Sequence, residues 1–269
     1  MYTYPPNKIL IVGGGEFGCA TALSLVNGPY IVAPECITIL DRSATPPSLD
    51  AASSDLNKIV RQDYSDEMYG KLAHQALEAW RTDEWRRHYH ECGTVILASK
   101  ESVHGEKYVR EALELNQRPE MSHKGKKAER LHTADDIRAR YPEAIERGAF
   151  DNEAAYFNPS CGWAAARAAC EQLVAMTRRV GVNFVQGDAA KLLYTDDRSD
   201  VAGVQLSDGT TILADLVVIA GGSWSSSLVP ELAQELLPTG QVVATIQLTP
   251  TEVELYRDAP VTLCMDTGL

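Results

Sequence analysis

The stretch Lys8–Val26, KILIVGGGEFGCATALSLV, decides the fold because it passes from a strand to a helix through a glycine-rich turn. The run Ile9–Val12 is apolar throughout, as in a strand that is buried on both faces of a parallel sheet. After Gly18 the apolar residues recur at helical spacing. This order of strand, turn and helix predicts a dinucleotide-binding fold.

The glycines of the turn follow the pattern Gly13-x-Gly15-x-x-Gly18. Gly13 permits a tight turn, Gly15 lets the main chain approach a pyrophosphate, and Gly18 lets the helix pack against the strand. The first N–H groups of the helix are then free to bind phosphate. The alternative interpretation of the pattern alone is a glycine-rich turn that binds nothing.

A second strand, predicted over residues 36–42, ends near Asp41, 23 residues after Gly18. A carboxylate at the tip of the second strand can accept hydrogen bonds from the ribose of an adenosine. The acid strengthens the prediction of a nucleotide site beyond what the glycines support.

The chain after Asp41 favours FAD over a nicotinamide cofactor. Residues 43–55 form a polar segment rich in proline and serine, which interrupts the regular strand and helix alternation of a nicotinamide enzyme. Further strands are predicted at 183–186, in a hairpin around 207–209, and at 215–222, where DLVVIAGG ends in glycines. A returning strand that ends in small residues is typical of flavin folds.

Two cations lie three residues apart in the segment 53–66, SSDLNKIVRQDYSD. Interspersed apolar residues predict a short amphipathic helical turn, which would place Lys58 and Arg61 on one face, toward an anionic group. The alternative is a turn whose basic residues are only solvated.

Other patterns predict the remaining elements. The segment 65–91 predicts a helix, 92–99 a strand, and 133–142 a helix that Thr133 opens as its N-cap. The segment 241–249, QVVATIQLT, is expected to return to the same sheet as residues 92–99.

Composition narrows the class of protein. The 269 residues carry 25 basic against 37 acidic side chains, a formal net charge of −12, which argues against nucleic acid or an anionic membrane as the main partner. No run of about 18 apolar residues and no secretory leader pattern is present, and the last three residues are not a peroxisomal signal. We expect an intracellular protein, cytoplasmic or peroxisomal, with no targeting signal in this chain.

Cysteine and histidine spacing predicts no metal site. The six cysteines contain no C-x-x-C pair and suit reduced thiols better than disulfides or zinc ligands. His88 and His90 fall on the predicted helix, where side chains two residues apart diverge. Cys264 is expected to be a buried structural thiol.

Four segments of the sequence resemble those of the flavin-dependent amine oxidases. This family includes monomeric sarcosine oxidase, pipecolate and saccharopine oxidases, and fungal fructosyl-amino-acid oxidases. The segments are IVGGGEFGCATALSL, ITILDR, SSDLNKIVRQDY and ADLVVIAGGSW, in this order, and DLNKI is most similar to the fungal branch. The resemblance covers essentially the whole chain, and its implied fold is α/β: an FAD-binding Rossmann-like domain of the glutathione-reductase type interleaved with an α+β substrate domain of mixed sheet.

The resemblance also implies roles for individual residues. Lys58 and Arg61 correspond to the catalytic cations, one beside the flavin ring and the other on the substrate carboxylate. The implied FAD-binding residues are Gly13, Gly15, Phe17 and Gly18 at the pyrophosphate, Asp41 and Arg42 at the adenosine, Ser54, Asn57, Lys58 and Ile59 at the isoalloxazine, Ala189 at the adenine, and Gly221, Gly222 and Trp224 on the return strand.

The implied activity is FAD-dependent oxidation of the C–N bond of an amino acid or N-substituted amino acid to an imine, with oxygen accepting the electrons as hydrogen peroxide. The residue types suit this activity. A guanidinium can hold a substrate carboxylate through two parallel hydrogen bonds, and a lysine supplies a movable positive charge. The implied partners are a small amine or amino-acid substrate and molecular oxygen, with no nucleic acid, no membrane and a monomeric enzyme.

The resemblance implies that the chain is C-terminally truncated relative to the family, since the expected second lysine and the cysteine for covalent FAD attachment are not found. Two alternatives therefore stay open: a catalytically inactive FAD-binding paralogue or fragment, and an FAD-dependent dehydrogenase with another acceptor. The predicted domains are 1–88 with 152–226 for FAD, and 89–151 with 227–269 for an incomplete substrate domain.

Overall fold

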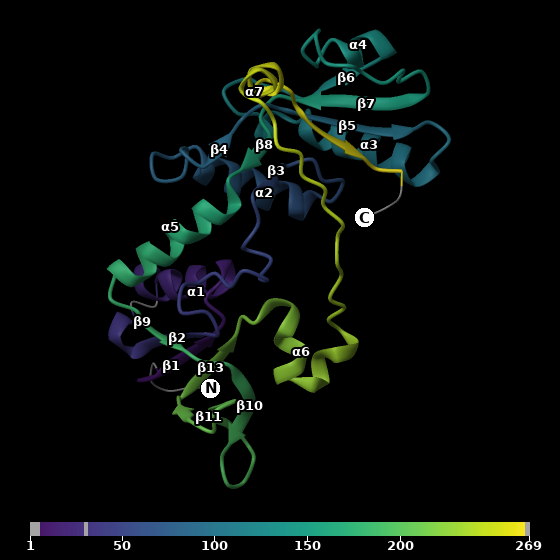
Figure 1. Cartoon of the computed structure of the whole chain (residues 1–269). Coiled ribbons are helices and arrows are strands. Elements are labelled where there is room, and N and C mark those ends of the chain that lie inside the picture. The colour runs from purple at the N-terminus through teal and green to yellow at the C-terminus, as the bar shows by residue number, and fades with distance from the viewer. Residues whose placement is uncertain (1–5, 30–31, 267–269) are drawn as a thin grey trace. The chain divides into compact units, whose positions relative to one another are not determined.

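The computed structural model describes residues 6–29 and 32–266 (Figure 1). The chain divides into two compact units, each assembled from two separated segments. The first unit comprises Met1–Leu56 and Ala166–Val242, and the second comprises Asn57–Ala165 and Val243–Leu269.

The first unit contains a parallel sheet, a smaller antiparallel sheet and helices. Its elements are β1 (Ile9–Val12), α1 (Glu16–Asn27), η1 (Pro34–Cys36), β2 (Ile37–Asp41), α5 (Ala166–Arg179), β9 (Asn183–Gln186), β10 (Ala189–Tyr194), β11 (Val201–Leu206), β12 (Thr211–Leu213), β13 (Leu216–Ile219), η3 (Gly222–Trp224), α6 (Ser225–Leu228) and η4 (Pro230–Gln234). The parallel sheet has the order β13-β1-β2-β9, and β10, β11 and β12 form the antiparallel sheet.

Strand β1 is buried on both faces, which explains its continuous apolar run. Ile9 and Ile11 pack with residues of α1 and α5, two helices that lie side by side in Figure 1. Leu10 and Val12 pack with residues of β11 on the other face. Helices and an antiparallel sheet therefore cover opposite faces of the parallel sheet, a layered α/β arrangement with a hydrophobic cluster on each face.

The second unit is built on a mixed sheet. Its elements are β3 (Lys58–Val60), α2 (Glu67–Trp80), β4 (Tyr89–His90), β5 (Thr94–Ser99), α3 (Val103–Asn116), η2 (Pro119–Met121), β6 (Glu129–Leu131), α4 (Ala134–Arg138), β7 (Glu153–Asn158), β8 (Gly162–Ala164), α7 (Pro250–Tyr256) and β14 (Val261–Cys264). The sheet has the order β14-β5-β7-β6, in which only β14 and β5 run parallel among the described pairs. Strands β3, β8 and β4 form an antiparallel sheet.

Several sequence-based predictions of elements are confirmed. The strands predicted at 92–99, 183–186 and 215–222 are β5, β9 and β13, and the predicted hairpin joins β11 to β12. Thr133 caps α4 as predicted, because its side chain accepts from the Asp136 N–H at 3.1 Å, but α4 ends at Arg138 and not at the predicted residue 142.

The helix predicted over 65–91 is wrong beyond Trp80, where α2 ends. The next residue, Arg81, donates from Nε to Glu91 at 2.7 Å and from Nη2 to the Ser160 carbonyl at 2.7 Å. These tertiary contacts redirect the chain, and His90 lies in β4 rather than on a helix.

The helical turn predicted around Lys58 and Arg61 is also wrong, because Lys58–Val60 is strand β3. Ile59 pairs with Trp163 and Val60 with Gly162 of β8, a pairing that suits β-branched residues. Because side chains alternate along a strand, a spacing of three does not bring Lys58 and Arg61 onto one face.

Residues 241–249 form no strand, contrary to prediction. Val242, Val243 and Ile246 are exposed, so this apolar run has no sheet to cover within the described chain. The strand that pairs with β5 is β14. Cys264 ends this strand and is exposed, so the prediction of a buried thiol is wrong.

The observed units differ in their limits from the predicted domains, because β3 and α2 belong to the second unit. A compact unit need not coincide with a cofactor-binding domain. The predicted division into an FAD domain and a substrate domain therefore remains a prediction. A helix long and apolar enough to span a bilayer does not occur in the described residues.

Candidate functional site

The glycine turn of the first unit leaves no room for side chains at two positions. Gly13 has φ +113°, and a Cβ there would lie 2.3 Å from the Ala220 carbonyl oxygen. A Cβ on Gly18 would lie 1.9 Å from the Gly13 carbonyl oxygen. The turn is therefore closed by main-chain contacts with the end of β13 and the start of α1, and a side chain at either position would open it.

Gly15 differs because the protein's own packing does not require a glycine there. Its backbone is extended, with φ −80° and ψ −164°, a conformation open to any residue. A Cβ on Gly15 would meet only the Ser53 side chain, at 3.0 Å, and Ser53 Oγ accepts from the Glu16 N–H at 3.1 Å. Neither the backbone conformation nor the packing within the protein requires a glycine at this position. A glycine is still expected there if a ligand approaches the main chain closely.

Asp41 ties the end of β2 to the glycine turn. Its buried carboxylate accepts from the Gly14 N–H at 2.7 Å and the Ser43 N–H at 2.8 Å, and from the Ser48 hydroxyl at 3.0 Å. A carboxylate has about four acceptor positions. Asp41 can thus hold the turn and still accept a hydrogen bond from a ligand.

Arg42 and Trp224, both predicted to lie in the cofactor site, are in direct contact. The guanidinium of Arg42 lies 3.9 Å from the centre of the Trp224 ring and pairs with Asp50 at 2.6 Å. Gly221 and Gly222 follow β13 directly, and Gly222 has φ +54°. The returning strand thus brings Trp224 to the end of β2.

Three other predicted FAD-binding residues of the first unit differ in exposure. Ser54 Oγ is buried and has no hydrogen-bond partner within residues 6–29 and 32–266. Phe17, on the first turn of α1, is 78% exposed, and Ala189 packs against the cluster that contains Leu40. A buried hydroxyl without a partner and an exposed aromatic ring are features that a bound ligand would satisfy. The residues of the first unit fit a dinucleotide such as FAD.

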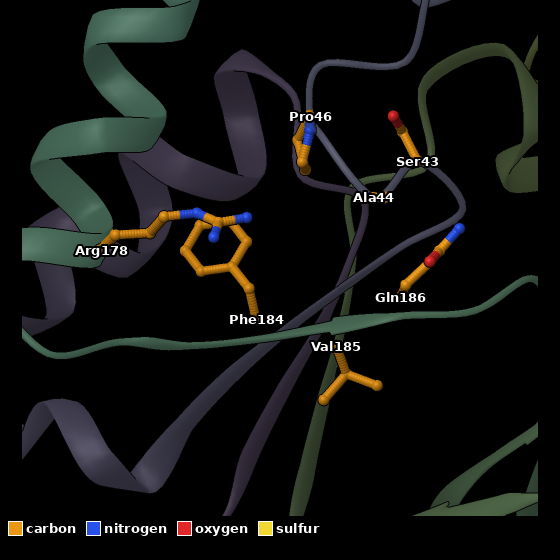
Figure 2. Close-up of a pocket in the computed structure, with 7 residues that line it drawn as sticks. All are labelled: Ser43, Ala44, Pro46, Arg178, Phe184, Val185 and Gln186. Atoms are coloured by element: carbon orange, nitrogen blue, oxygen red, sulfur yellow. The ribbon is translucent and has the colours of Figure 1, made fainter.

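A pocket of about 190 Å³ lies in the first unit at the carboxyl ends of β2 and β9. Figure 2 shows its lining residues, which are Ser43, Ala44, Pro46, Arg178, Phe184, Val185 and Gln186. The Arg178 guanidinium lies 4.4 Å from the centre of the Phe184 ring. Ligands of doubly wound folds bind at this edge of the sheet, but the volume suits only part of a large ligand. Its lining residues were not predicted from the sequence.

The other predicted site residues lie in the second unit, on and beside β3. Asn57, Lys58 and Ile59 are exposed, whereas Arg61 is half-buried. The Arg61 Nη1 donates to the Tyr108 hydroxyl at 3.0 Å and to the Asp63 carbonyl.

The charge on Arg61 is not matched by an ion pair with any residue in the described part of the chain. Its guanidinium lies 4.4 Å from the centre of the Tyr64 ring. Burial lowers the pKa of Arg61, but the hydrogen bond to Tyr108 and the proximity of Tyr64 and Asp63 outweigh burial, so the pKa is raised. Arg61 is therefore a permanent cation that makes no direct ion pair within the described residues, although the buried Asp63 lies close enough to favour its charge.

Asp63 is completely buried next to this cation. Its carboxylate accepts from Thr94 Oγ1 at 2.8 Å, Asn158 Nδ2 at 2.8 Å and the Tyr156 hydroxyl at 3.1 Å. Burial raises the pKa of Asp63, and the hydrogen bonds from Asn158 and Thr94 oppose this rise.

Sequence reasoning missed the residues that support both sites. Ser48 and Ser53 lie in a polar loop whose composition gave no reason to choose among its serines. Tyr108 reaches Arg61 from α3, and no local pattern connects the two. Asp63 lies two residues after Arg61, between Gln62 and Tyr64, in a polar segment that gave no reason to expect a buried carboxylate.

The chain is similar to known proteins along nearly its whole length. The family model described as FAD dependent oxidoreductase matches residues 8–268. L-saccharopine oxidase of Schizosaccharomyces pombe is 32% identical over 265 residues, which cover 94% of this chain and 59% of the relative. Amino acid oxidase fsqB of Aspergillus fumigatus is 30% identical, with 94% of this chain and 55% of the relative covered.

Solved structures give the same result. A thermally stable mutant of fructosyl peptide oxidase has a TM-score of 0.83 at 30% identity, covering 96% of this chain and 59% of that chain. Fructosyl amine: oxygen oxidoreductase (Amadoriase I) from Aspergillus fumigatus has a TM-score of 0.81 at 28% identity, covering 98% and 59%.

This chain spans 55% and 59% of the length of these two curated relatives. The predictions of the family, the fold class and FAD as the family's cofactor are confirmed. The chain belongs to the FAD dependent oxidoreductase family.

Proposed function

We propose that this chain carries the FAD site and the substrate-binding arginine of an oxidase that converts the C–N bond of an amino acid or N-substituted amino acid to an imine. The observation that carries the proposal is Arg61, a half-buried cation that forms no ion pair within the described residues. A substrate carboxylate would supply the counter-charge. The names of the relatives, L-saccharopine oxidase and amino acid oxidase, support a substrate of this class.

The residues proposed to hold FAD lie in both units. They are Gly13, Gly15, Phe17, Gly18, Asp41, Arg42, Ser54, Ala189, Gly221, Gly222 and Trp224 in the first unit, and Asn57, Lys58 and Ile59 in the second. The N–H groups at the start of α1 and the cation Lys58 would meet negative charge on the cofactor. When bound, FAD supplies the acceptor for the two electrons that the substrate gives up when it loses its α-C–H and N–H hydrogens and its C–N single bond becomes C=N; oxygen finally receives these electrons, with two protons, as hydrogen peroxide.

Arg61 would act by orienting the substrate. A guanidinium that holds a carboxylate through two parallel hydrogen bonds fixes the carboxylate plane and so limits the positions of the α-carbon and its nitrogen. The substrate amine must be neutral to be oxidised, and the imine product hydrolyses in water to a carbonyl compound and an amine.

The experiment is to load the chain with FAD and to measure hydrogen peroxide with sarcosine, pipecolate, saccharopine and fructosyl-amino acids. Arg61→Ala should lower kcat/KM about 100-fold for an acid substrate, as expected for a lost contact between charges. The decarboxylated amine of the same substrate is the control, because it has no group for Arg61 to hold. An equal loss for both compounds would contradict the proposed role.

The electron acceptor is tested in the same preparation. Reduction of an artificial dye without peroxide would identify a dehydrogenase rather than an oxidase. The proposal includes an intracellular monomer: six free cysteines support a reducing compartment, and the resemblance to monomeric sarcosine oxidase supports the monomer. Analytical ultracentrifugation measures the oligomeric state.

A further inference from the structure

We propose that Tyr108 and Asp63 are positioning residues that hold the guanidinium of Arg61 ready for a substrate carboxylate. The inference rests on the proposed function and adds the groups that fix the geometry of its substrate-binding cation. It is carried by hydrogen bonds within the second unit that join Arg61 to Tyr108 of α3 and to the Asp63 carbonyl, and join the Asp63 carboxylate to β5 and β7.

Tyr108 links the guanidinium to the main chain. Its hydroxyl accepts from Arg61 Nη1 at 3.0 Å and donates to the Asp63 carbonyl oxygen at 2.6 Å. The same carbonyl accepts a second hydrogen bond from Arg61 Nη1. One nitrogen of Arg61 is therefore held by two acceptors that are themselves joined.

The remaining edge of the guanidinium is left for a ligand. Arg61 Nε and Nη2 make no hydrogen bond to a residue within the described ranges. This pair of donors matches the two oxygens of a carboxylate. The ring of Tyr64, whose centre is 4.4 Å from the guanidinium carbon, covers one face of the plane.

Asp63 anchors the carbonyl that receives Arg61. Its carboxylate is held by Thr94 of β5 and by Tyr156 and Asn158 of β7, and no ion pair joins it to Arg61. A buried negative charge close by favours the cation without occupying its ligand-binding edge. The arrangement both supports the charge of Arg61 and keeps its Nε and Nη2 donors unpaired.

These contacts should raise the affinity for a carboxylate because they fix the Arg61 side chain before the ligand binds. A free arginine side chain has many rotamers, and ordering them when a ligand binds reduces affinity. If Tyr108 and Asp63 fix the rotamer in advance, removing either support should weaken carboxylate binding without removing the cation.

The test measures binding of propionate to the full chain by calorimetry, with neutral propionamide as the reference probe. Tyr108→Phe should weaken propionate binding roughly 5- to 10-fold, the effect of one hydrogen bond, and leave propionamide unchanged. Thr94→Val, which removes one donor to the Asp63 carboxylate, should weaken propionate about 2- to 3-fold. Tyr141→Phe is the matched control, because the Tyr141 hydroxyl bonds Thr262 instead.

A double-variant cycle shows whether Tyr108 acts through Arg61. Once Arg61→Ala is present, Tyr108→Phe should cause no further loss of propionate affinity. NMR of the Arg61 Nε–Hε group supplies a readout without ligand: its order should fall in Tyr108→Phe and stay unchanged in Tyr141→Phe.

The outcomes separate the two proposals. If wild type does not bind propionate, or if Arg61→Ala binds it as wild type does, the proposed role of Arg61 fails. If Arg61→Ala loses binding but Tyr108→Phe retains both affinity and Nε–Hε order, the role of Tyr108 is overturned and that of Arg61 stands. An unchanged Thr94→Val overturns the part assigned to Asp63.

Discussion

The glycine turn at residues 13–18 and the segment 58–64 are built in opposite ways. The turn is closed by main-chain contacts, in which the carbonyls of Gly13 and Ala220 fill the space where side chains would be. Arg61, in contrast, is held by the Tyr108 side chain and by a carbonyl that the buried Asp63 anchors. The turn should therefore be disrupted by substitutions that add a side chain at its glycines. The position of Arg61 should be disrupted by substitutions that remove the groups that hold it.

The largest effect is expected for Gly18→Ala. The added methyl group would overlap the Gly13 carbonyl, a main-chain atom that cannot move without opening the contact between β1 and α1. We expect a loss of about 3 kcal/mol or more in the free energy of unfolding, measured with urea. Gly240→Ala is the control, since its methyl group would meet nothing within 4 Å. Equal midpoints for the two variants would refute the packing described for the turn.

A smaller effect is expected when the same turn loses its side-chain support. Asp41→Asn would place an amide N–H₂ toward the donors Gly14 N–H or Ser43 N–H, so the free energy of unfolding should fall by about 2 kcal/mol. Asp50→Asn removes only a partly exposed ion pair with Arg42 and should cost less than about 1 kcal/mol. If Asp50→Asn lowered the free energy of unfolding more than Asp41→Asn does, the proposed support of the turn by Asp41 would be contradicted.

The smallest effect concerns a charge cluster of the second unit. Burial raises the pKa of Glu91, but hydrogen bonds from Lys126 and Arg81 at 2.6 and 2.7 Å outweigh it, so the pKa is lowered. A lowered pKa in the folded state stabilises the protein above the unfolded pKa of about 4.3, and this contribution disappears as the pH falls through the folded pKa.

Glu91→Gln should therefore cost about 1 kcal/mol at pH 7 and progressively less toward pH 3, measured by urea unfolding at each pH. Wild type and variant should converge in acid. A difference that stays constant over this pH range would mean that the charge of Glu91 is not the source of the stability.

These two regions also differ in how far the sequence could predict them. The order of strand, turn and helix was predicted correctly because the apolar run Ile9–Val12 and the glycines that follow it are adjacent in sequence, and β13 confirmed the expected returning strand. The helical turn at Lys58 was wrong because pairing of Ile59 with the distant Trp163 decides that β3 is a strand. No local pattern contains such a pairing.

The same reason explains the supporting residues. Tyr108 lies on an amphipathic helix where a tyrosine is ordinary, and its contact with Arg61 arises only when α3 packs on the sheet. The end of α2 depends likewise on Arg81 reaching Ser160. Residue types could be predicted from motifs, whereas the contacts that position them are set by tertiary structure.

The measurement that tests the central claim most directly is a titration of FAD into the folded chain, followed by quenching of flavin fluorescence, with Gly15→Val as the comparison. Position 15 has an extended backbone, and its Cβ would meet only the Ser53 side chain, so the variant should keep the fold. The added side chain would lie where the pyrophosphate approaches, and we expect saturable binding by wild type that is about 10- to 100-fold weaker in Gly15→Val. A wild-type chain that is folded by circular dichroism yet binds no FAD, or a Gly15→Val variant that binds equally well, would contradict the account.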